Sequence, residues 1–439
     1  MPVPNFNPKE LDLNEEFLAA FQLMEHTTES AFITGKAGTG KSTLLKYFKT
    51  ATHKNVVIVA PTGVAAINIE GQTIHSFFRF PPRLIIPEDV RKSYNAKILK
   101  KMDVLIIDEV SMVRADLLDG IDASLRVNRN SREPFGGVQV ILFGDMFQLP
   151  PVVREDIKQY LSENYDSPYF FSAKVFAKMD FKTIELHTVY RQPEAKFVSL
   201  LNKIRMNTMT EEDLDLINSR VAPQTPESGE DSVLTLTTTN AIAERMNSTR
   251  LGAIKSPLFT YKADISGDFE ETVFPTQPLL LLKVGAQVMF LRNDPQKRWV
   301  NGTLGKVSYL SKHSIKVTVG DFERAQEHAL EHEVQLGSWE KIKYYYDEEN
   351  KRIDAKVTGT FKQFPLKLAW AITIHKSQGQ TFDRVMIDLG HGAFVHGQAY
   401  VALSRCRTLE GITLKRRLAP RDIIFDEQVL GFKNNFVFD

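Results

Sequence analysis

The segment Ala31-Phe-Ile-Thr-Gly-Lys-Ala-Gly-Thr-Gly-Lys-Ser-Thr43 decides the fold of this 439-residue chain. Its residues 35–42 match the pattern G-x-x-x-x-G-K-[ST]. The apolar residues 31–34 predict a strand before the loop, and residues 43–48 predict a helix after it. Glycines let backbone N–H groups converge on phosphate oxygens, and the start of a helix adds favourable partial charge. A chance match is the alternative, but the flanking strand and helix favour nucleotide binding.

Two side chains of this loop are expected to have specific roles. Lys41 is expected to reach the β- and γ-phosphates, and the Ser42 hydroxyl is expected to hold Mg²⁺. The other loop residues expected to contact the nucleotide are Gly35, Gly38, Thr39, Gly40 and Thr43. The predicted cofactors are therefore ATP and Mg²⁺.

Two further apolar strands end in polar groups that suit phosphate chemistry. In Val104-Leu-Ile-Ile-Asp-Glu109, Asp108 is expected to hold the metal and Glu109 to polarise the attacking water. In Gly144-Asp-Met-Phe-Gln-Leu-Pro-Pro151, Gln148 is expected to sense the γ-phosphate. The alternatives are a solvated acidic turn and a plain strand-to-loop junction. Together with the phosphate loop, however, these motifs favour hydrolysis over binding alone.

Two arginines in the second half are candidates for stabilising the transferring phosphoryl group. Arg191 lies in Val-Tyr-Arg-Gln, and Arg405 lies in Ala-Leu-Ser-Arg-Cys-Arg. An arginine finger contributes on the order of 10³–10⁵ in rate in GTPases. If both belong to a second α/β unit, hydrolysis would open and close a cleft between two domains. Ordinary surface ion pairs are the alternative, and spacing alone does not exclude them.

Composition limits the function in a few ways. The chain is 43% hydrophobic and 25% charged, and it has no 18-residue apolar run, so we expect no membrane partner. Acidic residues near the N-terminus do not fit a signal or transit peptide, so we expect a cytoplasmic protein. The single cysteine, Cys406, excludes an intrachain disulfide and a Cys-based zinc site. Because the net charge is only +1, any binding of nucleic acid must depend on a local group of residues and not on the overall charge of the chain.

The order of strands predicts two α/β units, consistent with the two to four domains that this length favours. Four apolar strands separated by helical patterns fall within the first 150 residues, which is typical of a parallel sheet covered on both faces. A second set lies at residues 233–237, 385–389 and 412–414. Between its members, roughly residues 278–360, alternating stretches and the Asn301-Gly302 turn predict a small β-barrel. Residues 221–232 predict a surface loop.

In this order, the motifs resemble those of superfamily 1 helicases, specifically the PIF-type and RecD-like 5′-to-3′ DNA helicases. The most specific match is Trp370-Ala-Ile-Thr-Ile-His-Lys-Ser-Gln-Gly-Gln-Thr381, in which Gly379 is expected to contact the nucleotide. Thr73-Ile-His-Ser-Phe77, after Ala60-Pro-Thr-Gly63, is similar to the first DNA-contacting motifs. Leu125-Arg126, Arg129 and residues 134–139 resemble the PIF signature. The resemblance covers about residues 13–410.

The resemblance implies an α/β fold with two RecA-like parallel-sheet P-loop NTPase domains. The first spans residues 1–180 and contains a wedge insertion at about residues 76–96. The second spans residues 181–277 and 362–439, and an SH3-like β-barrel is inserted at residues 278–361. Phe77, Phe78, Phe80 and Pro81-Pro82 make the wedge stiff and aromatic, although these aromatic residues are equally typical of a core.

The resemblance also implies that the chain is an ATP-dependent helicase that moves 5′ to 3′ on single-stranded DNA and opens tailed or forked duplex. One chain is the expected active unit, and G-quadruplexes and RNA–DNA hybrids are further candidate substrates. A nucleic-acid-stimulated ATPase that remodels or clamps single strands is the alternative. The residues expected to face the DNA are Pro61, Thr62, His75, Phe77, Asn240, Thr373, His375 and Lys376. Such contacts to sugar, phosphate and stacked bases tolerate any sequence.

Two features do not fit this interpretation directly. The family often places an adenine-reading Gln before the phosphate loop, but Leu13-Asn-Glu-Glu-Phe-Leu18 lacks one, and the nearby Gln22 lies on a helical pattern. His328-Ala-Leu-Glu-His332 matches the zinc-protease pattern H-x-x-E-H. Its heavily charged surroundings favour a solvated segment over a zinc site.

Overall fold

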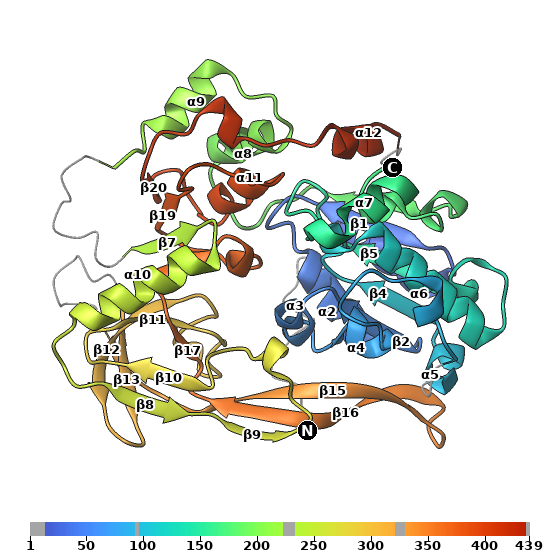
Figure 1. The fold of residues 1–439 in the computed structure, drawn as a ribbon, viewed down its shortest axis with the longest axis horizontal. Coiled ribbons are helices and arrows are strands. Elements are labelled where there is room, and N and C mark those ends of the chain that lie inside the picture. Colours follow the sequence, from blue (N-terminus) through green and yellow to red (C-terminus); the bar gives the residue numbers. More distant parts are fainter. Residues whose placement is uncertain (1–13, 93–95, 223–232, 321–329, 436–439) are drawn as a thin grey trace. The chain divides into compact units, whose positions relative to one another are not determined.

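The computed structural model describes residues 14–92, 96–222, 233–320 and 330–435, and the chain forms two compact units (Figure 1). The first unit comprises Met1–Tyr190, Glu340–Gly359 and Asp426–Asp439. The second comprises Arg191–Trp339 and Thr360–Phe425. Within the described residues, no helix is long and apolar enough to cross a membrane.

The first unit contains a six-stranded parallel sheet. Its strand order is β3-β2-β4-β5-β1-β6, and every neighbouring pair is parallel. The strands are β1 (Ala31–Gly35), β2 (Val56–Ala60), β3 (Gln72–Thr73), β4 (Val104–Ile107), β5 (Gln139–Phe143) and β6 (Lys182–Leu186). Because β6 pairs with β1 along its whole length, this unit extends to Tyr190 rather than ending at the expected residue 180.

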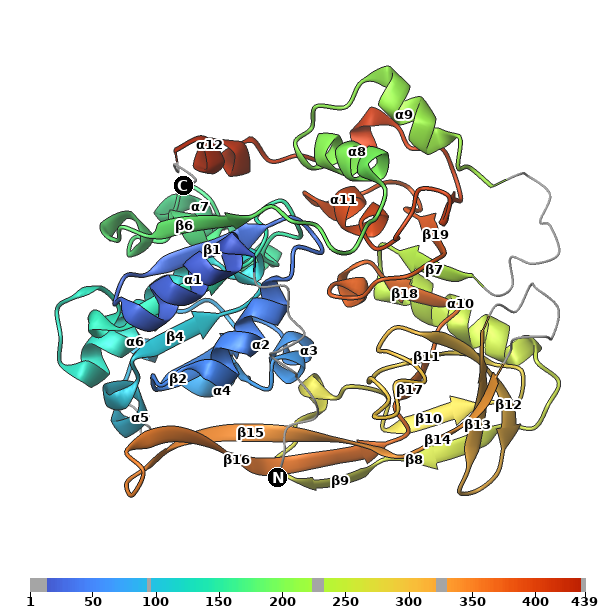
Figure 2. The same cartoon turned by 180° about the vertical axis from the view of Figure 1, so that it is seen from behind.

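Helices cover both faces of this sheet, as near-continuous apolar strands require. On one face, Ile33 and Ile106 join a core with Phe17, Met24 and Phe48 of α1 (Glu15–His26) and α2 (Lys41–Ala51). On the opposite face lies α6 (Ala115–Arg129), which buries four leucine and isoleucine side chains (Figures 1 and 2). The other helices of this unit are α3 (Gly63–Asn68), α4 (Ile74–Phe78), α5 (Ala96–Lys101), α7 (Glu155–Asn164) and α12 (Glu427–Asn435). The sheet and its helices therefore hold the phosphate loop on a rigid base.

The segment expected to form the wedge is anchored to this unit. Phe78 and Phe80 stack at 5.5 Å between ring centroids, and both are buried. Arg83 forms a bidentate ion pair with Asp89, at 2.7 and 2.8 Å. The Ile85 N–H donates to Asp116 on α6 at 3.0 Å. Residues 93–95, which fall within the expected wedge, lie outside the described residues.

The second unit contains a four-stranded parallel sheet of order β18-β7-β19-β20. These strands are β7 (Leu234–Thr237), β18 (Ala371–Thr373), β19 (Val385–Asp388) and β20 (Ile412–Leu414). Its helices are α8 (Ala195–Arg205), α9 (Glu211–Asn218), α10 (Asn240–Ala253) and α11 (Gln398–Leu403). The chain therefore has the α/β fold with two parallel sheets that its motifs imply.

The predicted β-rich insertion is a five-stranded antiparallel sheet of order β14-β13-β12-β11-β17. Its strands are β11 (Gln287–Phe290), β12 (Leu304–Leu310), β13 (Ile315–Val319), β14 (Leu330–Val334) and β17 (Leu366–Leu368). A β10–β8 pair (Leu279–Leu282 with Phe259–Lys262) adds Leu280, Leu282 and Tyr261 to the same core. The insertion therefore uses strands on both sides of the expected 278–361 range.

A long hairpin, β15 (Gly337–Asp347) and β16 (Arg352–Gln363), joins β9 (Asp264–Gly267) in a third sheet (Figure 2). Its tip, residues 340–359, is part of the first unit. There the Tyr344 hydroxyl bonds the backbone of Ile58 on β2, and Gln72 Nε2 donates to Ile342 O at 2.9 Å. Lys97 and Glu348 form an ion pair. The expectation that residues 278–361 form a single insertion domain therefore differs from the units seen here.

Candidate functional site

Left-handed glycines shape the loop between β1 and α2. Gly38 and Gly40 both have φ of 86°, in the region that favours glycine. A Cβ at Gly40 would lie 2.9 Å from the ring of Phe17, which is itself buried. The Gly38 carbonyl accepts from the Tyr190 N–H at 2.9 Å, which ties the loop to the chain after β6. The loop therefore has little room for side chains and a fixed path.

Lys41 lies at the start of α2, as the motif predicts. Its Nζ donates to the carbonyls of Gly35 at 2.6 Å and Lys36 at 3.0 Å. Phosphate oxygens carry full negative charge and are stronger acceptors than these neutral carbonyls. Lys41 is therefore held by its own loop in a position from which it can exchange onto a phosphate.

The structure brings the two carboxylates of the second motif to the same edge of the sheet. The Asp108 N–H donates to Val59 O at 2.9 Å, so Asp108 directly follows the paired part of β4. Burial and the nearby Glu109 charge raise the pKa of Asp108, the charges of Lys41 and Lys46 oppose this increase, and the resulting pKa is about 7. Glu109 has φ of 50°, a strained conformation for a non-glycine residue. Strain held at such a position is typical of functional sites.

These groups fit Mg²⁺ and a nucleotide. A divalent cation would offset the repulsion between the buried Asp108 carboxylate and the Glu109 charge that raises the pKa of Asp108, and Mg²⁺ prefers oxygen ligands. Asp108 and the Ser42 hydroxyl remain the predicted oxygen ligands of this cation. Among the described residues, no group of three or more His, Cys, Asp or Glu side chains could hold a metal.

Gln148 follows β5 at the same edge of the sheet. Its side chain is buried, and its Nε2 donates to Asp145 at 3.3 Å. The Gly144 N–H donates to Ile33 O at 3.2 Å, so the turn after β5 lies beside β1. The structure thus brings Lys41, Asp108, Glu109 and Gln148 to the carboxyl edge of one sheet, where parallel α/β folds bind ligands.

The two expected arginines lie together in the second unit. Arg191 Nη1 donates to Ser404 O at 3.4 Å, and Arg405 Nη2 donates to the Ser404 hydroxyl at 2.9 Å. Arg405 is 1% exposed, and its Nε donates to Val401 O at 2.9 Å. Gln192 also donates to Ser404 O, at 3.0 Å. Ser404 therefore accepts hydrogen bonds from the side chains of both arginines and of Gln192.

The segment 370–381 contains the edge strand β18 and the turn that follows it. The Lys376 N–H donates to the Thr373 hydroxyl at 3.2 Å, and the Ile374 N–H donates to Thr237 O at 2.9 Å. Thr373 is buried, His375 is half-buried, and Lys376 and Gly379 are exposed. Burial lowers the pKa of His375. The turn therefore presents Lys376 to solvent on a backbone fixed by Thr373.

The remaining predicted DNA-facing residues differ in exposure. Asn240 is exposed at the start of α10, where Thr239 caps the helix. Pro61, Thr62 and His75 are half-buried, and the Thr62 hydroxyl caps α3. Burial lowers the pKa of His75, and the charge of Arg114 lowers it further. Phe77 is 2% exposed, and its ring packs against Phe78 and Tyr344, so this structure places Phe77 in the core.

One basic residue beside this segment was missed by the sequence analysis. Lys367 lies on β17 between Leu366 and Leu368, whose side chains pack into the core of the antiparallel sheet. Alternation along the strand turns Lys367 to the opposite face. Burial and, to a smaller extent, the charge of Lys376 lower the pKa of Lys367 to about 8. Sequence gives no signal for this pair because the two lysines lie on different elements.

The residues resembling the PIF signature have a structural role here. Arg129 Nε donates to Gly136 O at 2.8 Å, and its Nη1 donates to three carbonyls at the end of α5, those of Leu99, Lys100 and Met102. The Phe135 N–H donates to Asp122 at 2.6 Å. Arg129 therefore fastens the turn before β5 to the end of α5.

The zinc-protease pattern is not assembled as a site in the part of the chain that is described. His332 lies on β14 with its ring 5.7 Å from that of Trp299, and Glu331 pairs with Lys316 at 2.9 Å. His328 lies outside the described residues. Gln22, the candidate adenine reader, is exposed on α1.

Comparison with known proteins agrees with this arrangement. Residues 13–215 match the family described as PIF1-like helicase, and residues 270–310 match the 2B domain of DNA helicase Pif1. The ATP-dependent DNA helicase Pif1 of Bdellovibrio bacteriovorus is 35% identical over 442 residues, covering 97% of this chain and 93% of that protein. The human ATP-dependent DNA helicase PIF1 is 34% identical over 420 residues, covering 92% of this chain, which spans 61% of the human protein.

Solved structures give the same result. A Bacteroides Pif1 in complex with ADP-AlF4 is 40% identical, covers 97% of each chain and superposes with a TM-score of 0.89. A Bacteroides Pif1 bound to single-stranded DNA is also 40% identical, covers 97% of each chain and has a TM-score of 0.69. Since both the sequence match and the fold extend over nearly the whole chain, this protein belongs to the PIF1-like helicases.

Proposed function

We propose that this PIF1-like helicase hydrolyses ATP at residues 35–42, moves 5′ to 3′ along single-stranded DNA and opens tailed or forked duplex. The observation that carries the proposal is the convergence of Lys41, Asp108, Glu109 and Gln148 at the carboxyl edge of one parallel sheet. The names of the relatives, which are ATP-dependent DNA helicases, support the DNA substrate. The resemblance supports the polarity. One chain is proposed as the active unit.

The proposed chemistry assigns a task to each of these groups. ATP with Mg²⁺ supplies the phosphoanhydride bond that is broken. Lys41 donates to phosphate oxygens, and Asp108 and Ser42 hold the cation. Glu109 accepts a proton from the attacking water, and Gln148 orients that water beside the γ-phosphate. Arg191 and Arg405 stabilise the charge that develops on the transferring phosphoryl group.

The proposed DNA contacts need no net positive charge on the whole chain. Asn240 and Lys376 are exposed, and the half-buried His375 lies beside Lys376. Hydrogen bonds to sugar and phosphate fix a strand without reading its sequence, which a translocating enzyme requires. Lys367 adds a second ammonium near Lys376. A phosphate between these two lysines would relieve their mutual repulsion.

An unwinding assay on matched substrates tests the function and its polarity. With ATP and Mg²⁺, we expect a duplex with a 5′ single-stranded tail to be opened and the same duplex with a 3′ tail to remain closed. The opposite result would overturn the polarity. Opening of neither duplex, combined with DNA-stimulated hydrolysis, would favour a remodelling or clamping ATPase. RNA–DNA hybrid and G-quadruplex arms of the same assay would define the substrate range.

Two variants separate the nucleotide site from the DNA site. Lys41→Ala should reduce ATP hydrolysis at least about 100-fold, because the phosphoryl group loses its principal cation. Its affinity for single-stranded DNA should change by less than about twofold, because Lys41 Nζ bonds the Gly35 and Lys36 carbonyls within the phosphate loop, away from the residues proposed to face the DNA. Lys376→Ala should lower DNA-stimulated hydrolysis more than basal hydrolysis. Equal losses of both rates in Lys376→Ala would argue against its DNA-facing role.

A further inference from the structure

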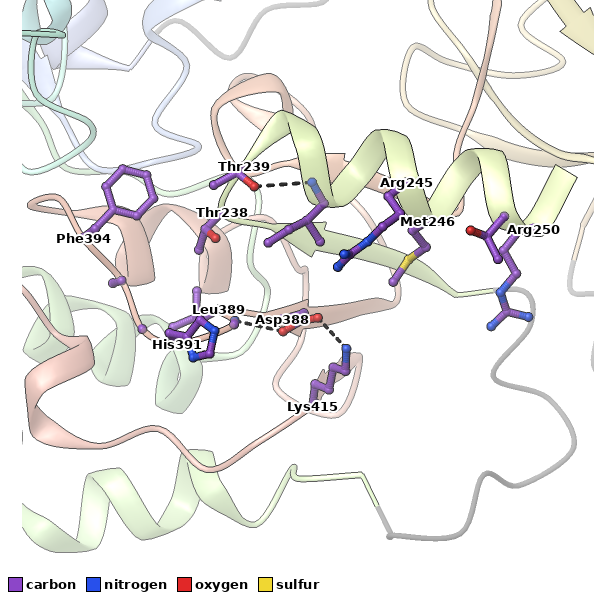
Figure 3. A pocket seen from close by; sticks show the side chains of 15 residues that line it. Thr238, Thr239, Arg245, Met246, Arg250, Asp388, Leu389, His391, Phe394 and Lys415 are labelled. Atoms are coloured by element: carbon purple, nitrogen blue, oxygen red, sulfur yellow. Dashed lines mark hydrogen bonds and ion pairs between the residues drawn. The ribbon is translucent and has the colours of Figure 1, made fainter. Parts of the chain in front are cut away.

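A cavity of about 760 Å³ opens in the second unit, at the carboxyl ends of β7 and β19 and beside α10 (Figure 3). None of the chemistry assigned above uses it. Ligands of open parallel sheets bind where loops leave the carboxyl ends of the strands. The position of the cavity alone therefore makes it a candidate binding site.

The charge of the cavity favours an anion. Arg245, Arg250 and Lys415 line it, and Asp388 is its single carboxylate. Asp388 is already engaged, because it accepts from Lys415 Nζ at 2.6 Å and from the Gly390 N–H at 2.9 Å. In Figure 3 the exposed Arg245 side chain extends from α10 toward Asp388 and Lys415. The lining therefore keeps a surplus of positive charge that solvent can reach.

An aromatic ring accompanies these cations. Phe394 lines the cavity and is 57% exposed, which is unusual for a phenylalanine. It lies in the loop after β19, where Gly390 and Gly392 have φ of 57° and 146°. Cations beside an exposed aromatic ring are the combination by which proteins hold single-stranded nucleic acid without reading its sequence.

The cavity also lies next to a residue that is predicted to contact DNA. Its wall includes Thr239, whose hydroxyl caps α10, and Asn240 is the first residue of that helix. Arg245 lies five residues further along, about 7 Å along the helix axis. A strand held at Asn240 would therefore meet the cavity with its next nucleotides.

We propose that this cavity binds the sugar–phosphate backbone of the single strand next to the segment held at Asn240, with Arg245 contacting a phosphate and Phe394 stacking on a base. The proposal rests on the proposed function, because it extends the path of the same strand. It adds a subsite that lengthens the occupied site and strengthens the hold on the strand.

Binding of oligothymidylates of increasing length tests the subsite. Lengths from about 4 to about 16 nucleotides span the usual single-strand site sizes. In fluorescence anisotropy, Arg245→Gln and Phe394→Ala should each weaken binding of the longest oligonucleotide about tenfold. Neither substitution should change the affinity for the shortest oligonucleotide that the wild-type chain binds. Both side chains are exposed, so both variants should fold.

The salt dependence of DNA binding distinguishes the phosphate contact of Arg245 from the base stacking of Phe394. Arg245→Gln should reduce the slope of log K against log salt by about 0.7, the value for one phosphate contact on a single strand, and Phe394→Ala should leave it unchanged. Lys312→Gln, an exposed cation of the same unit outside the cavity, is the matched control and should change neither length dependence nor slope.

Three outcomes would overturn the subsite. They are unchanged binding of Arg245→Gln at every length, equal losses at every length, and a raised KM for ATP without a change in DNA binding. The last would assign the cavity to a nucleotide. Failure of the wild-type chain to bind any single strand would instead overturn the proposed function.

Discussion

At the scale of single residues, sequence patterns did not predict how deeply individual side chains are buried. Arg405 is buried with its guanidinium bonded to Val401 and Ser404, and Phe77 packs in an aromatic core. Lys367, in contrast, has no paired carboxylate among the described residues. A lysine that is partly buried without a counter-charge lowers the stability of the folded chain.

Lys367 therefore predicts an unusual pH dependence of stability. Its folded pKa is about 8, below the ordinary 10.5, so between these values the unfolded chain binds the extra proton. Stability contributed by this group consequently rises as pH increases from about 8 to about 10.5. Lys367→Met should stabilise the second unit by about 1–3 kcal/mol at pH 7 and by less at pH 10.

Tryptophan fluorescence suits this measurement because all three tryptophans, Trp299, Trp339 and Trp370, lie in the second unit. Urea unfolding of wild type and variant would be compared at pH 7 and pH 10. Lys362→Met, an exposed lysine on β16, is the control and should show no such trend. An equal effect of Lys367→Met at both pH values would mean that Lys367 keeps its ordinary pKa.

At the scale of elements, α5 and the turn before β5 depend on one side chain. Arg129→Ala would leave the carbonyls of Leu99, Met102 and Gly136 without their donor. We expect a loss of about 2–4 kcal/mol in the first unit, seen by circular dichroism as a lower urea midpoint. Arg129→Lys should restore only part of it, because an ammonium cannot reproduce the planar fork of guanidinium donors. Arg126→Ala, on the same helix, should cost less than about 1 kcal/mol, since the partly exposed Arg126 pairs with Asp122 at a long distance, 3.5 Å.

Elements that are specified by neighbouring residues can be predicted from the sequence. Contacts between residues that are far apart in the sequence cannot. The strand, loop and helix of residues 31–48 are contiguous, so glycine spacing and apolar runs suffice to predict both fold and ligand there. Tyr344 bonds Ile58 across 286 positions, and the pattern around either residue contains no sign of the other. The same holds for α12, whose Phe432 stacks on Phe171 at 4.3 Å and so belongs to the first unit. Such pairings depend on tertiary packing, which overrides local preference.

At the scale of the whole molecule, the net charge of +1 and the proposed DNA contacts have to be reconciled. Strong long-range attraction to DNA requires an excess of positive charge, and this chain has almost none. Exposed Lys376 and Arg245 place cations where a strand would lie. Affinity should therefore come from a few close phosphate contacts and from stacking, rather than from the field of the whole protein.

This distribution of charge predicts a shallow salt dependence. Each phosphate contact on a single strand contributes a slope of about −0.7 to log K against log salt, so a few contacts give a total of about −2 to −4. The association rate should change little over the same range of salt. The long-range electrostatic attraction between this chain and DNA is weak, so there is little attraction for salt to screen. Stopped-flow binding to oligothymidylate, with equilibrium titrations at each salt concentration, measures both quantities. A slope steeper than about −6, or an association rate that falls sharply with salt, would show that charges distributed over the whole surface hold the DNA.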